Sequence, residues 1–340
     1  MSAPEKTPLL DVRDLHVEFR TPIGVVHAVD GLSYQLFENE IVGIVGESGC
    51  GKSASQLAVM QLLQSPPGFI SGGEVIFEGK DLVRFKRDSP EMRSVRGGQI
   101  AMIFQEPMTS LNPVMTIGDQ LVEAVKLHCG LGGQSPDEVA AGLLKMVGIP
   151  GAERRVKDYP HQFSGGMCQR VMIAMGLSCS PRILIADEPT TALDVTTQAQ
   201  MLELMKNLVR QFGASLIIVT HNLGVVARYA QRIYVMYAGR VVEEGTTKDI
   251  FAHPRHPYTL GLLKSVPRLD EVHGSRLVPI DGMPPNLIDM PGTCAFLPRC
   301  PFSVEQCRTD LWPELTSVGD GHRIRCYVNL GDRDLEPALS

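Results

Sequence analysis

The sequence has no long apolar run and no N-terminal targeting pattern. No stretch approaches the 18 or more apolar residues of a membrane-spanning helix. The N-terminus, Met-Ser-Ala-Pro-Glu-Lys, lacks the basic region and the apolar stretch of a signal peptide. We therefore expect the chain to stay in the cytoplasm, where structural disulfides are rare. If it acts at a membrane, other subunits must span it.

An excess of basic residues is also missing. The formal net charge is -6, whereas a nucleic-acid-binding domain normally carries a basic surface. We see no internal repeat and no low-complexity segment beyond a polar C-terminus, so repeat architectures are not expected. We predict no nucleic-acid partner.

What is present is the composition of an ordinary globular protein. The 340 residues are 44% hydrophobic and 21% charged, enough for one large α/β domain and an appendage. Apolar strands alternate with segments of helical spacing, which favours a largely parallel sheet, and the section 107–160 reads as a helical insertion. The clearest predicted strands are Ile41–Val45, Glu74–Phe77, Ile183–Ala186 and Leu216–Val219, and the clearest helices are Ser53–Leu63, Leu121–Leu127, Val139–Val147 and Gln198–Phe212.

A glycine-rich segment follows the first of these strands and fits the pattern G-x-x-x-x-G-K-[ST] completely. Its residues are Gly46, Glu47, Ser48, Gly49, Cys50, Gly51, Lys52 and Ser53. The backbone N–H groups of such a loop surround phosphate oxygens, Lys52 reaches the terminal phosphates, and the Ser53 hydroxyl can ligate Mg²⁺. A strand-to-helix turn without a ligand is the alternative. The strand-loop-helix context favours a nucleoside triphosphate site.

Two adjacent carboxylates, Asp187 and Glu188, end another apolar strand. Parallel sheets bind ligands at this edge, and transfer of a phosphoryl group to water needs a metal and a base. Asp187 suits the Mg²⁺ shell and Glu188 can polarise the attacking water. Taken alone, the pair could also be a solvated acidic turn.

Two further elements are weak signals by themselves. Ser164-Gly165-Gly166 leads into an apolar helix, where an ordinary serine N-cap is the simpler reading. His221 follows the strand Leu216–Val219 and Thr220, and a lone histidine is more often a core or surface residue.

In this order the motifs resemble an ABC-type nucleotide-binding domain over about residues 8–250. The resemblance implies that residues 46–53 are Walker A, Gln105 the Q-loop, Ser164-Gly165-Gly166 the signature, and Asp187-Glu188 Walker B. It also makes Ala192-Leu193-Asp194 the D-loop, His221 the switch histidine, and Phe19 the ring that stacks on adenine. The signature departs from the family by Phe163 and Met167, where Leu and Gln are usual.

The resemblance implies an α/β fold with a P-loop NTPase (RecA-like) core. The core would span residues 1–106 and 160–252, with a helical subdomain at 107–159 and a Cys-containing C-terminal extension at 253–340. In this family two domains sandwich two ATP molecules, so Ser164, Gly165, Gly166 and Asp194 would complete the partner's site. Ser53, Gln105 and Asp187 would hold Mg²⁺, and Glu188, His221 and Gln105 would be catalytic.

Four of the eight cysteines lie in the extension: Cys294, Cys300, Cys307 and Cys326. Their C-x5-C-x6-C-x18-C spacing alone does not identify a ligand. Together with His256-Pro257-Tyr258-Thr259 and Pro298-Arg299-Cys300-Pro301 they resemble the extension of ATPase subunits from peptide and nickel importers. That resemblance implies a [4Fe-4S] cluster on the four thiolates; zinc, or unligated thiols, are the alternatives. We interpret Cys129, Cys168 and Cys179 as packing or local-loop residues.

The expected function is ATP hydrolysis that drives a membrane importer of dipeptides or oligopeptides. The resemblance is greatest to D-type subunits of dipeptide permeases. It implies a homologous F-type ATPase partner, two transmembrane permease subunits, an extracytoplasmic peptide-binding protein and a peripheral place on the cytoplasmic face of the inner membrane. Nickel chelates or haem-like compounds are alternative cargoes. A soluble ABC ATPase of DNA repair or translation, or a metal or redox sensor built on the cysteines, are alternative functions.

Overall fold

The computed structural model describes residues 6–189, 194–265, 279–288, 290–319 and 321–332. The chain divides into two compact units. The first comprises Met1–Leu36, Val42–Val83 and Thr220–Ser340, and the second Phe37–Ile41 and Arg84–Val219. Within the described ranges, none of the helices combines the length and the apolar character needed to cross a bilayer.

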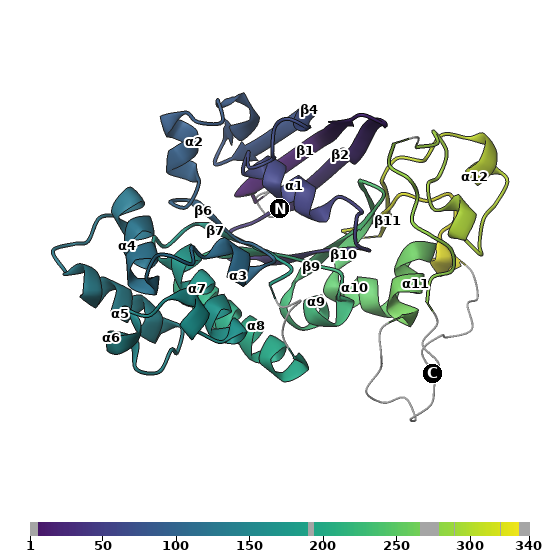
Figure 1. Cartoon of the computed structure of the whole chain (residues 1–340). Coiled ribbons are helices and arrows are strands. Elements are labelled where there is room, and N and C mark those ends of the chain that lie inside the picture. The colour runs from purple at the N-terminus through teal and green to yellow at the C-terminus, as the bar shows by residue number, and fades with distance from the viewer. Residues whose placement is uncertain (1–5, 190–193, 266–278, 289, 320, 333–340) are drawn as a thin grey trace. The chain divides into compact units, whose positions relative to one another are not determined.

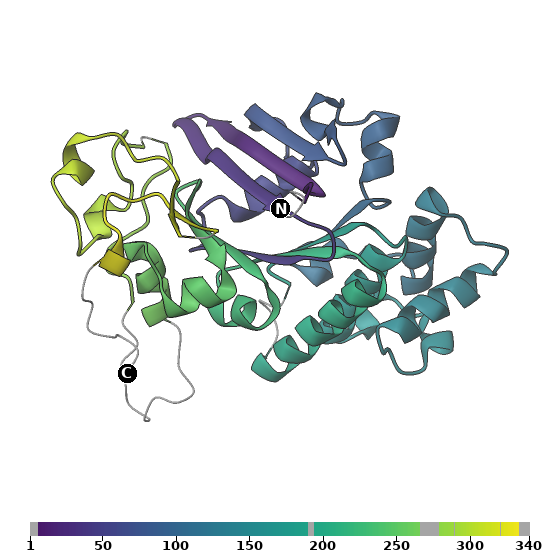
Figure 2. The same ribbon diagram turned by 180° about the vertical axis from the view of Figure 1, so that it is seen from behind.

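The first unit contains an antiparallel sheet with the order β2-β1-β4-β5 (Figure 1). Its strands are β1 (Leu10–Thr21), β2 (Gly24–Leu36), β4 (Gly68–Phe77) and β5 (Lys80–Asp81). Leu10, Leu15 and Val17 of β1 are fully buried, so one face of the strand packs into the core. Seen from behind, β1, β2 and β4 form one purple-to-blue layer (Figure 2).

A second set of strands in the first unit has the order β11-β12-β10-β9-β3. The strands are β3 (Ile41–Val45), β9 (Arg232–Tyr237), β10 (Arg240–Thr246), β11 (Thr316–Gly319) and β12 (His322–Ile324). Every residue of β3 is buried, as expected for a parallel strand covered on both faces. Gly43 allows close packing of α9, because an added Cβ would lie 2.1 Å from Val226 Cγ1.

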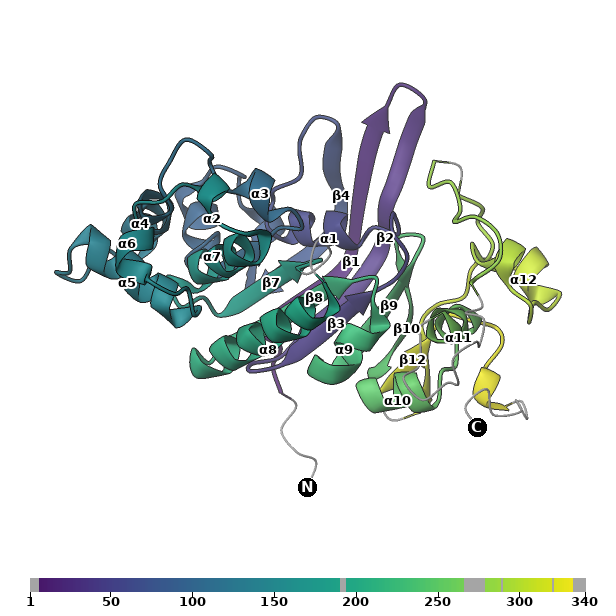
Figure 3. The same ribbon diagram turned by 60° about the horizontal axis from the view of Figure 1, so that its bottom comes forward.

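Helices of the first unit complete it around these strands. They are α1 (Lys52–Val59), α9 (Leu223–Tyr229), α10 (Thr247–Ala252), α11 (Pro257–Lys264) and α12 (Gln306–Thr309), with 3₁₀ turns at Leu82–Arg84, Leu297–Arg299 and Leu330–Asp332. Figure 3 shows α10 beside β9 and β10, which it contacts. Helix α1 stops four residues before the predicted end at Leu63, because Gln61 adopts a left-handed φ of 49°.

The second unit is built on three parallel strands in the order β8-β7-β6. They are β6 (Ile100–Ile103), β7 (Ile183–Asp187) and β8 (Ser215–Thr220). Helix α7 (Gly165–Leu177) contacts β6, and α8 (Val195–Gln211) contacts α7. The remaining helices are α2 (Pro90–Val95), α3 (Pro107–Ser110), α4 (Ile117–His128), α5 (Pro136–Met146) and α6 (Ala152–Arg155), with a 3₁₀ turn at Pro160–Gln162.

The predicted α/β class with a parallel sheet and a helical section is confirmed. The predicted strands and helices are present with shifted ends, and α5 begins at a capping box in which Ser135 and Glu138 exchange hydrogen bonds. The sulfur atoms of Cys129 and Cys179 lie 2.8 Å apart, a contact that the sequence did not predict. Chain folding brings these two thiols together, although 50 positions separate them.

Candidate active site

The glycine-rich loop runs from the end of β3 into the first turn of α1. Gly51 caps this helix with a φ of 99°, and a Cβ added to it would lie 2.0 Å from the carbonyl oxygen of Ala28 in β2. A Cβ added to Gly46 would lie 2.2 Å from the carbonyl oxygen of Met236 in β9. Both positions require glycine, since any side chain would push the loop off these two strands.

Lys52 is buried inside this loop and is only 4% exposed. Its Nζ donates to the carbonyl oxygens of Gly46 at 2.8 Å and Glu47 at 2.9 Å, with a longer contact of 3.9 Å to Cys50 Sγ. An ammonium carries three N–H groups, so a phosphate oxygen can replace the weak sulfur contact. Burial raises the pKa of the Cys50 thiol, which therefore stays protonated and is no nucleophile.

The acidic pair lies at the end of β7 in the second unit. Asp187 is 5% and Glu188 9% exposed, and Glu188 has a φ of 45°, a conformation that non-glycine residues rarely adopt. The amide of Gln105, after β6, donates to Glu188 Oε2 at 3.1 Å. The structure thus brings two of the three predicted catalytic side chains into direct contact.

The signature and D-loop residues begin two neighbouring helices of the second unit. Ser164 is the N-cap of α7, where its hydroxyl accepts from the N–H of Met167 at 3.3 Å. Asp194 is the N-cap of α8 and accepts from the N–H of Thr197 at 3.0 Å and from its hydroxyl at 2.7 Å. A Cβ added to Gly166 would lie 3.6 Å from Thr197 Cγ2, so the two helix starts are adjacent. Ala192 and Leu193 lie outside the described residues.

Besides the phosphate loop, the first unit contains two predicted site residues, His221 and Phe19. His221 is exposed in the turn after β8. Phe19 lies in β1, where its ring faces Gly68 of β4 at a distance that leaves no room for a side chain on that residue. The predicted nucleotide residues are thus divided between the units. Phe19, the loop 46–53 and His221 belong to the first unit, and the signature, the acidic pair, Gln105 and Asp194 belong to the second.

Mg²⁺ prefers oxygen ligands, and the predicted set meets that preference. It offers the hydroxyl of Ser53, at the start of α1, and the carboxylate of Asp187 and the amide of Gln105, each next to the end of a buried strand. Each of these groups thus offers an oxygen donor of the kind that Mg²⁺ prefers.

The four cysteines of the extension gather in space. Burial, followed by the charges of the neighbouring thiols, raises the pKa of Cys294 to about 11 and that of Cys326 to about 12. For Cys326 those neighbours are Cys294, Cys300 and Cys307. No group of three or more His, Cys, Asp or Glu side chains is arranged to hold a metal ion in the part of the chain that the structure describes. As they are placed, the four thiols therefore do not form a ligand set for the predicted [4Fe-4S] cluster.

Sequence reasoning did not assign Tyr258 and Arg299 to the site, although both contact the phosphate loop. The Tyr258 hydroxyl accepts from the N–H of Glu47 at 2.8 Å. Arg299 pairs with the Glu47 carboxylate at 2.6 and 2.8 Å. Both residues belong to the two short motifs by which the extension resembles that of peptide-importer ATPases. These motifs were the only sequence signal that pointed to Tyr258 and Arg299.

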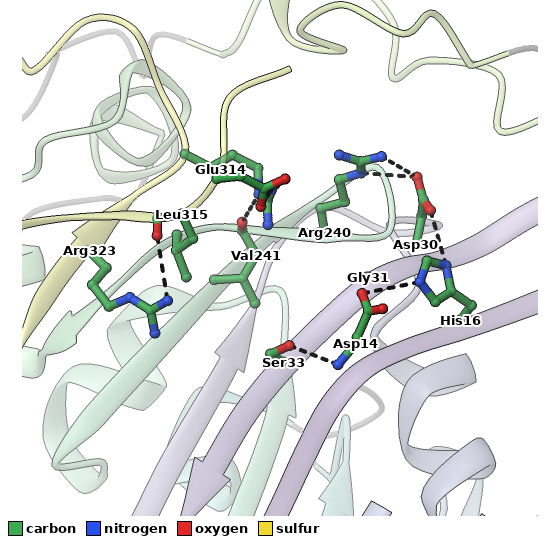
Figure 4. A pocket seen from close by; sticks show the side chains of 11 residues that line it. Asp14, His16, Asp30, Gly31, Ser33, Arg240, Val241, Glu314, Leu315 and Arg323 are labelled. Carbon is green, nitrogen blue, oxygen red and sulfur yellow. Dashed lines mark hydrogen bonds and ion pairs between the residues drawn. The ribbon is translucent and has the colours of Figure 1, made fainter. Parts of the chain in front are cut away.

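A polar cavity of about 260 Å³ lies between the β1–β2 hairpin and the extension (Figure 4). Its charges are paired with one another. Arg240 donates to Asp30 at 2.9 and 2.7 Å, and His16 lies 3.2 Å from both Asp30 and Asp14. Burial alone would raise the pKa of Asp30, but the hydrogen bond and charge of Arg240 hold it below its usual value. In the cavity wall, the ion pair of Asp30 and Arg240 thus joins the hairpin to β10, whereas Arg325 and Glu314 pair within the extension.

Comparisons with known proteins agree with this arrangement. The description "ABC transporter" matches residues 29–191, and "Oligopeptide/dipeptide transporter, C-terminal region" matches residues 242–307. The chain is 51% identical over 320 residues to the dipeptide transport ATP-binding protein DppD of Bacillus subtilis, covering 94% of each chain. It is 50% identical over 322 residues to the oligopeptide transport ATP-binding protein OppD of Haemophilus influenzae, covering 95% of this chain and 98% of that one.

Solved structures give the same assignment. The dimeric, post-hydrolysis ATP-binding cassette MJ0796, bound to ADP and Pi, is 27% identical with a TM-score of 0.62, over 70% of this chain and 98% of that one. A likeness along nearly the full length of the curated relatives, at about half of all positions, establishes common descent. The chain therefore belongs to the ABC transporter ATPases, within the family of dipeptide and oligopeptide transport ATP-binding proteins.

Proposed function

We propose that the chain is the ATP-hydrolysing, energy-coupling subunit of an importer for dipeptides or oligopeptides. The observation that carries the proposal is the full-length likeness to DppD and OppD proteins, since it includes both the ATPase and the transporter-specific extension. ATP closes a pair of such domains and hydrolysis reopens it, and this two-state motion drives alternating access in the membrane subunits.

Each site residue then has a proposed role. The loop 46–53 binds the phosphates, with Lys52 on the terminal ones, and Phe19 stacks on adenine. Ser53, Gln105 and Asp187 would hold Mg²⁺, which would supply positive charge to the phosphate oxygens. Glu188 polarises the attacking water, and its hydrogen bond from Gln105 fixes the orientation of the carboxylate. His221 contacts the terminal phosphate as the switch histidine.

The second half of each ATP site comes from a partner. Ser164, Gly165 and Gly166 at the start of α7, and Asp194 at the start of α8, complete the partner's site. The dimeric state of the cassette MJ0796 supports this proposal. We propose a homologous F-type ATPase as the partner, two transmembrane permease subunits, an extracytoplasmic peptide-binding protein, and a peripheral position on the cytoplasmic face of the inner membrane.

Substitution of Glu188 by Gln tests the catalytic role. We expect Glu188→Gln to keep ATP binding and to lower turnover by on the order of 10²- to 10⁴-fold, the usual effect of an acid–base group. The matched control is Glu153→Gln, because Glu153 is an exposed residue of α6 that pairs with the exposed Lys145. Near-normal ATP hydrolysis by Glu188→Gln in the assembled transporter would refute the role.

We propose a [4Fe-4S] cluster on Cys294, Cys300, Cys307 and Cys326 from the C-x5-C-x6-C-x18-C array of the extension. Bound iron requires thiolates, so cluster insertion must release protons from the buried thiols. Purification without oxygen should yield about four iron atoms per chain. Cys307→Ser should lose this iron, while Cys179→Ser should retain it. A colourless, zinc-containing preparation would overturn the proposal.

A further inference from the structure

Arg299 of the extension is enclosed and fully paired. Its side chain is 3% exposed. Nη1 and Nη2 donate to the two oxygens of Glu47 at 2.6 and 2.8 Å, and also to the Tyr237 hydroxyl at 3.4 Å and the Ile280 carbonyl at 3.3 Å. Nε donates to the Asp281 carbonyl at 3.0 Å. All five guanidinium N–H groups therefore have an acceptor, and only the planar fork of arginine provides this set.

Aromatic packing fixes the surroundings of this pair. Tyr237 of β9, Tyr258 of α11 and Phe296 of the extension meet with ring centroids 4.6 to 5.4 Å apart. All three are 2% exposed or less. The Tyr258 hydroxyl is held by this packing at 2.8 Å from the N–H of Glu47. The contacts to Glu47 thus come from a rigid part of the extension.

Glu47 in turn positions Lys52. The Glu47 carboxylate is held by Arg299, its N–H by Tyr258, and its carbonyl oxygen accepts from Lys52 Nζ at 2.9 Å. The carbonyl oxygen of the preceding residue, Gly46, is the other strong acceptor for the same ammonium. A displacement of Glu47 would therefore move two of the atoms that place the phosphate-binding lysine.

We propose that Arg299 and Tyr258 are positioning residues of the ATPase, which hold the phosphate loop in its ATP-binding shape from within the C-terminal extension. The inference rests on the proposed function, because it takes the loop to bind ATP. It adds that the extension is part of the nucleotide site, whatever the four cysteines bind. The extension acts on ATP through Glu47 and Lys52 and does not itself touch the nucleotide.

The test compares two buried arginines of the extension in the full-length chain. Arg299→Gln removes the fork on Glu47. Arg325→Gln is the matched control, since Arg325 is 8% exposed but bonds to Val241, Pro313 and Glu314, away from the loop. We expect both variants to lower the melting temperature. Arg299→Gln alone should raise the Kd for ATP by about tenfold, which corresponds to about 1.4 kcal/mol.

Three further measurements make the outcome decisive. In ATPase assays KM should rise more than kcat falls, because the loop is misplaced before ATP binds. Arg299→Lys restores the charge without the fork and should recover only part of the affinity. Tyr258→Phe removes a single hydroxyl and should also weaken ATP binding. This variant tests the inference even if Arg299→Gln does not fold.

Specific results would contradict the inference. A Kd for ATP within twofold of wild type in both Arg299→Lys and Tyr258→Phe would overturn it. So would an equal loss of affinity in Arg325→Gln, since the effect would then follow from stability alone. Failure of the wild-type chain to bind ATP would instead refute the proposed function, so the two failures are distinguishable.

Discussion

The carboxylate of Glu243 provides a quantitative test of how the extension is attached. This residue of β10 is completely buried. It accepts from the backbone N–H groups of Arg255 at 2.7 Å and His256 at 2.9 Å, and from His322 Nε2 at 2.7 Å. Glu243→Ala would leave three buried donors without this acceptor. We expect a loss of about 3 to 5 kcal/mol in the free energy of unfolding, as when one partner of a buried ionic contact is removed.

The sequence supplies its own probe for this experiment. The chain has a single tryptophan, Trp312, which is buried in the extension with Arg240 stacked 5.0 Å from its ring. Its fluorescence therefore reports whether the extension is docked. A loss of this size corresponds to a midpoint shift of about 6 to 10 °C, at roughly 2 °C per kcal/mol for a chain of this length.

The neighbouring residue provides the control. Glu244 pairs with Arg323, whose side chain is 47% exposed, so Glu244→Ala should cost below about 1 kcal/mol. Equal shifts for the two variants, or a change below about 1 kcal/mol for Glu243→Ala, would refute the reasoning that buried N–H groups depend on this carboxylate.

Burial lowers the pKa of His256 to about 4 despite the opposing charge of Glu243, so between pH 6.5 and 4 only the unfolded chain takes up this proton. The free energy of unfolding should therefore decrease as the pH is lowered from 6.5 to 4, by up to about 3 kcal/mol. Urea denaturation at several pH values should show a smaller decrease in His256→Asn. Gly51→Ala should abolish binding of a fluorescent ATP analogue, because the new Cβ would lie 2.0 Å from the carbonyl oxygen of Ala28. The control variant Gly142→Ala should bind the analogue normally, since no atom lies within 4 Å of its added Cβ. Ser135→Ala should destabilise α5 by about 1 kcal/mol in thermal unfolding, because it removes the N-cap.

The strands and the phosphate loop could be predicted because their signals are local. The apolar strand β3 is followed by glycines at the positions where a positive φ or a neighbouring strand leaves no room for a side chain. The sequence pattern of the loop and its structure therefore agree. The hydrogen bond from Gln105 to Glu188 could be expected only through the family resemblance, since it joins residues 83 positions apart. Local sequence cannot encode such a contact, which depends on the neighbouring positions of β6 and β7 in the sheet.

The contacts of the extension were beyond sequence reasoning for the same reason. Glu47 and Arg299 are 252 positions apart, and in isolation each reads as an ordinary surface charge. The helix α1 was predicted too long, because apolar spacing continues past Val59 while Gln61 already has a left-handed backbone. The gathering of four cysteines could be suspected from their number, but their spacing gave no ligand geometry.

The buried carboxylate on β10 also bears on how this family could gain or lose residues 253–340. A descendant that simply lost them would lose the three donors that this carboxylate accepts from, and it would leave the aromatic face of Tyr237 bare. The contacts that favour an acidic residue at position 243 would then be gone. In ABC ATPases without this extension, an acidic residue at the matching position of that strand should be rare.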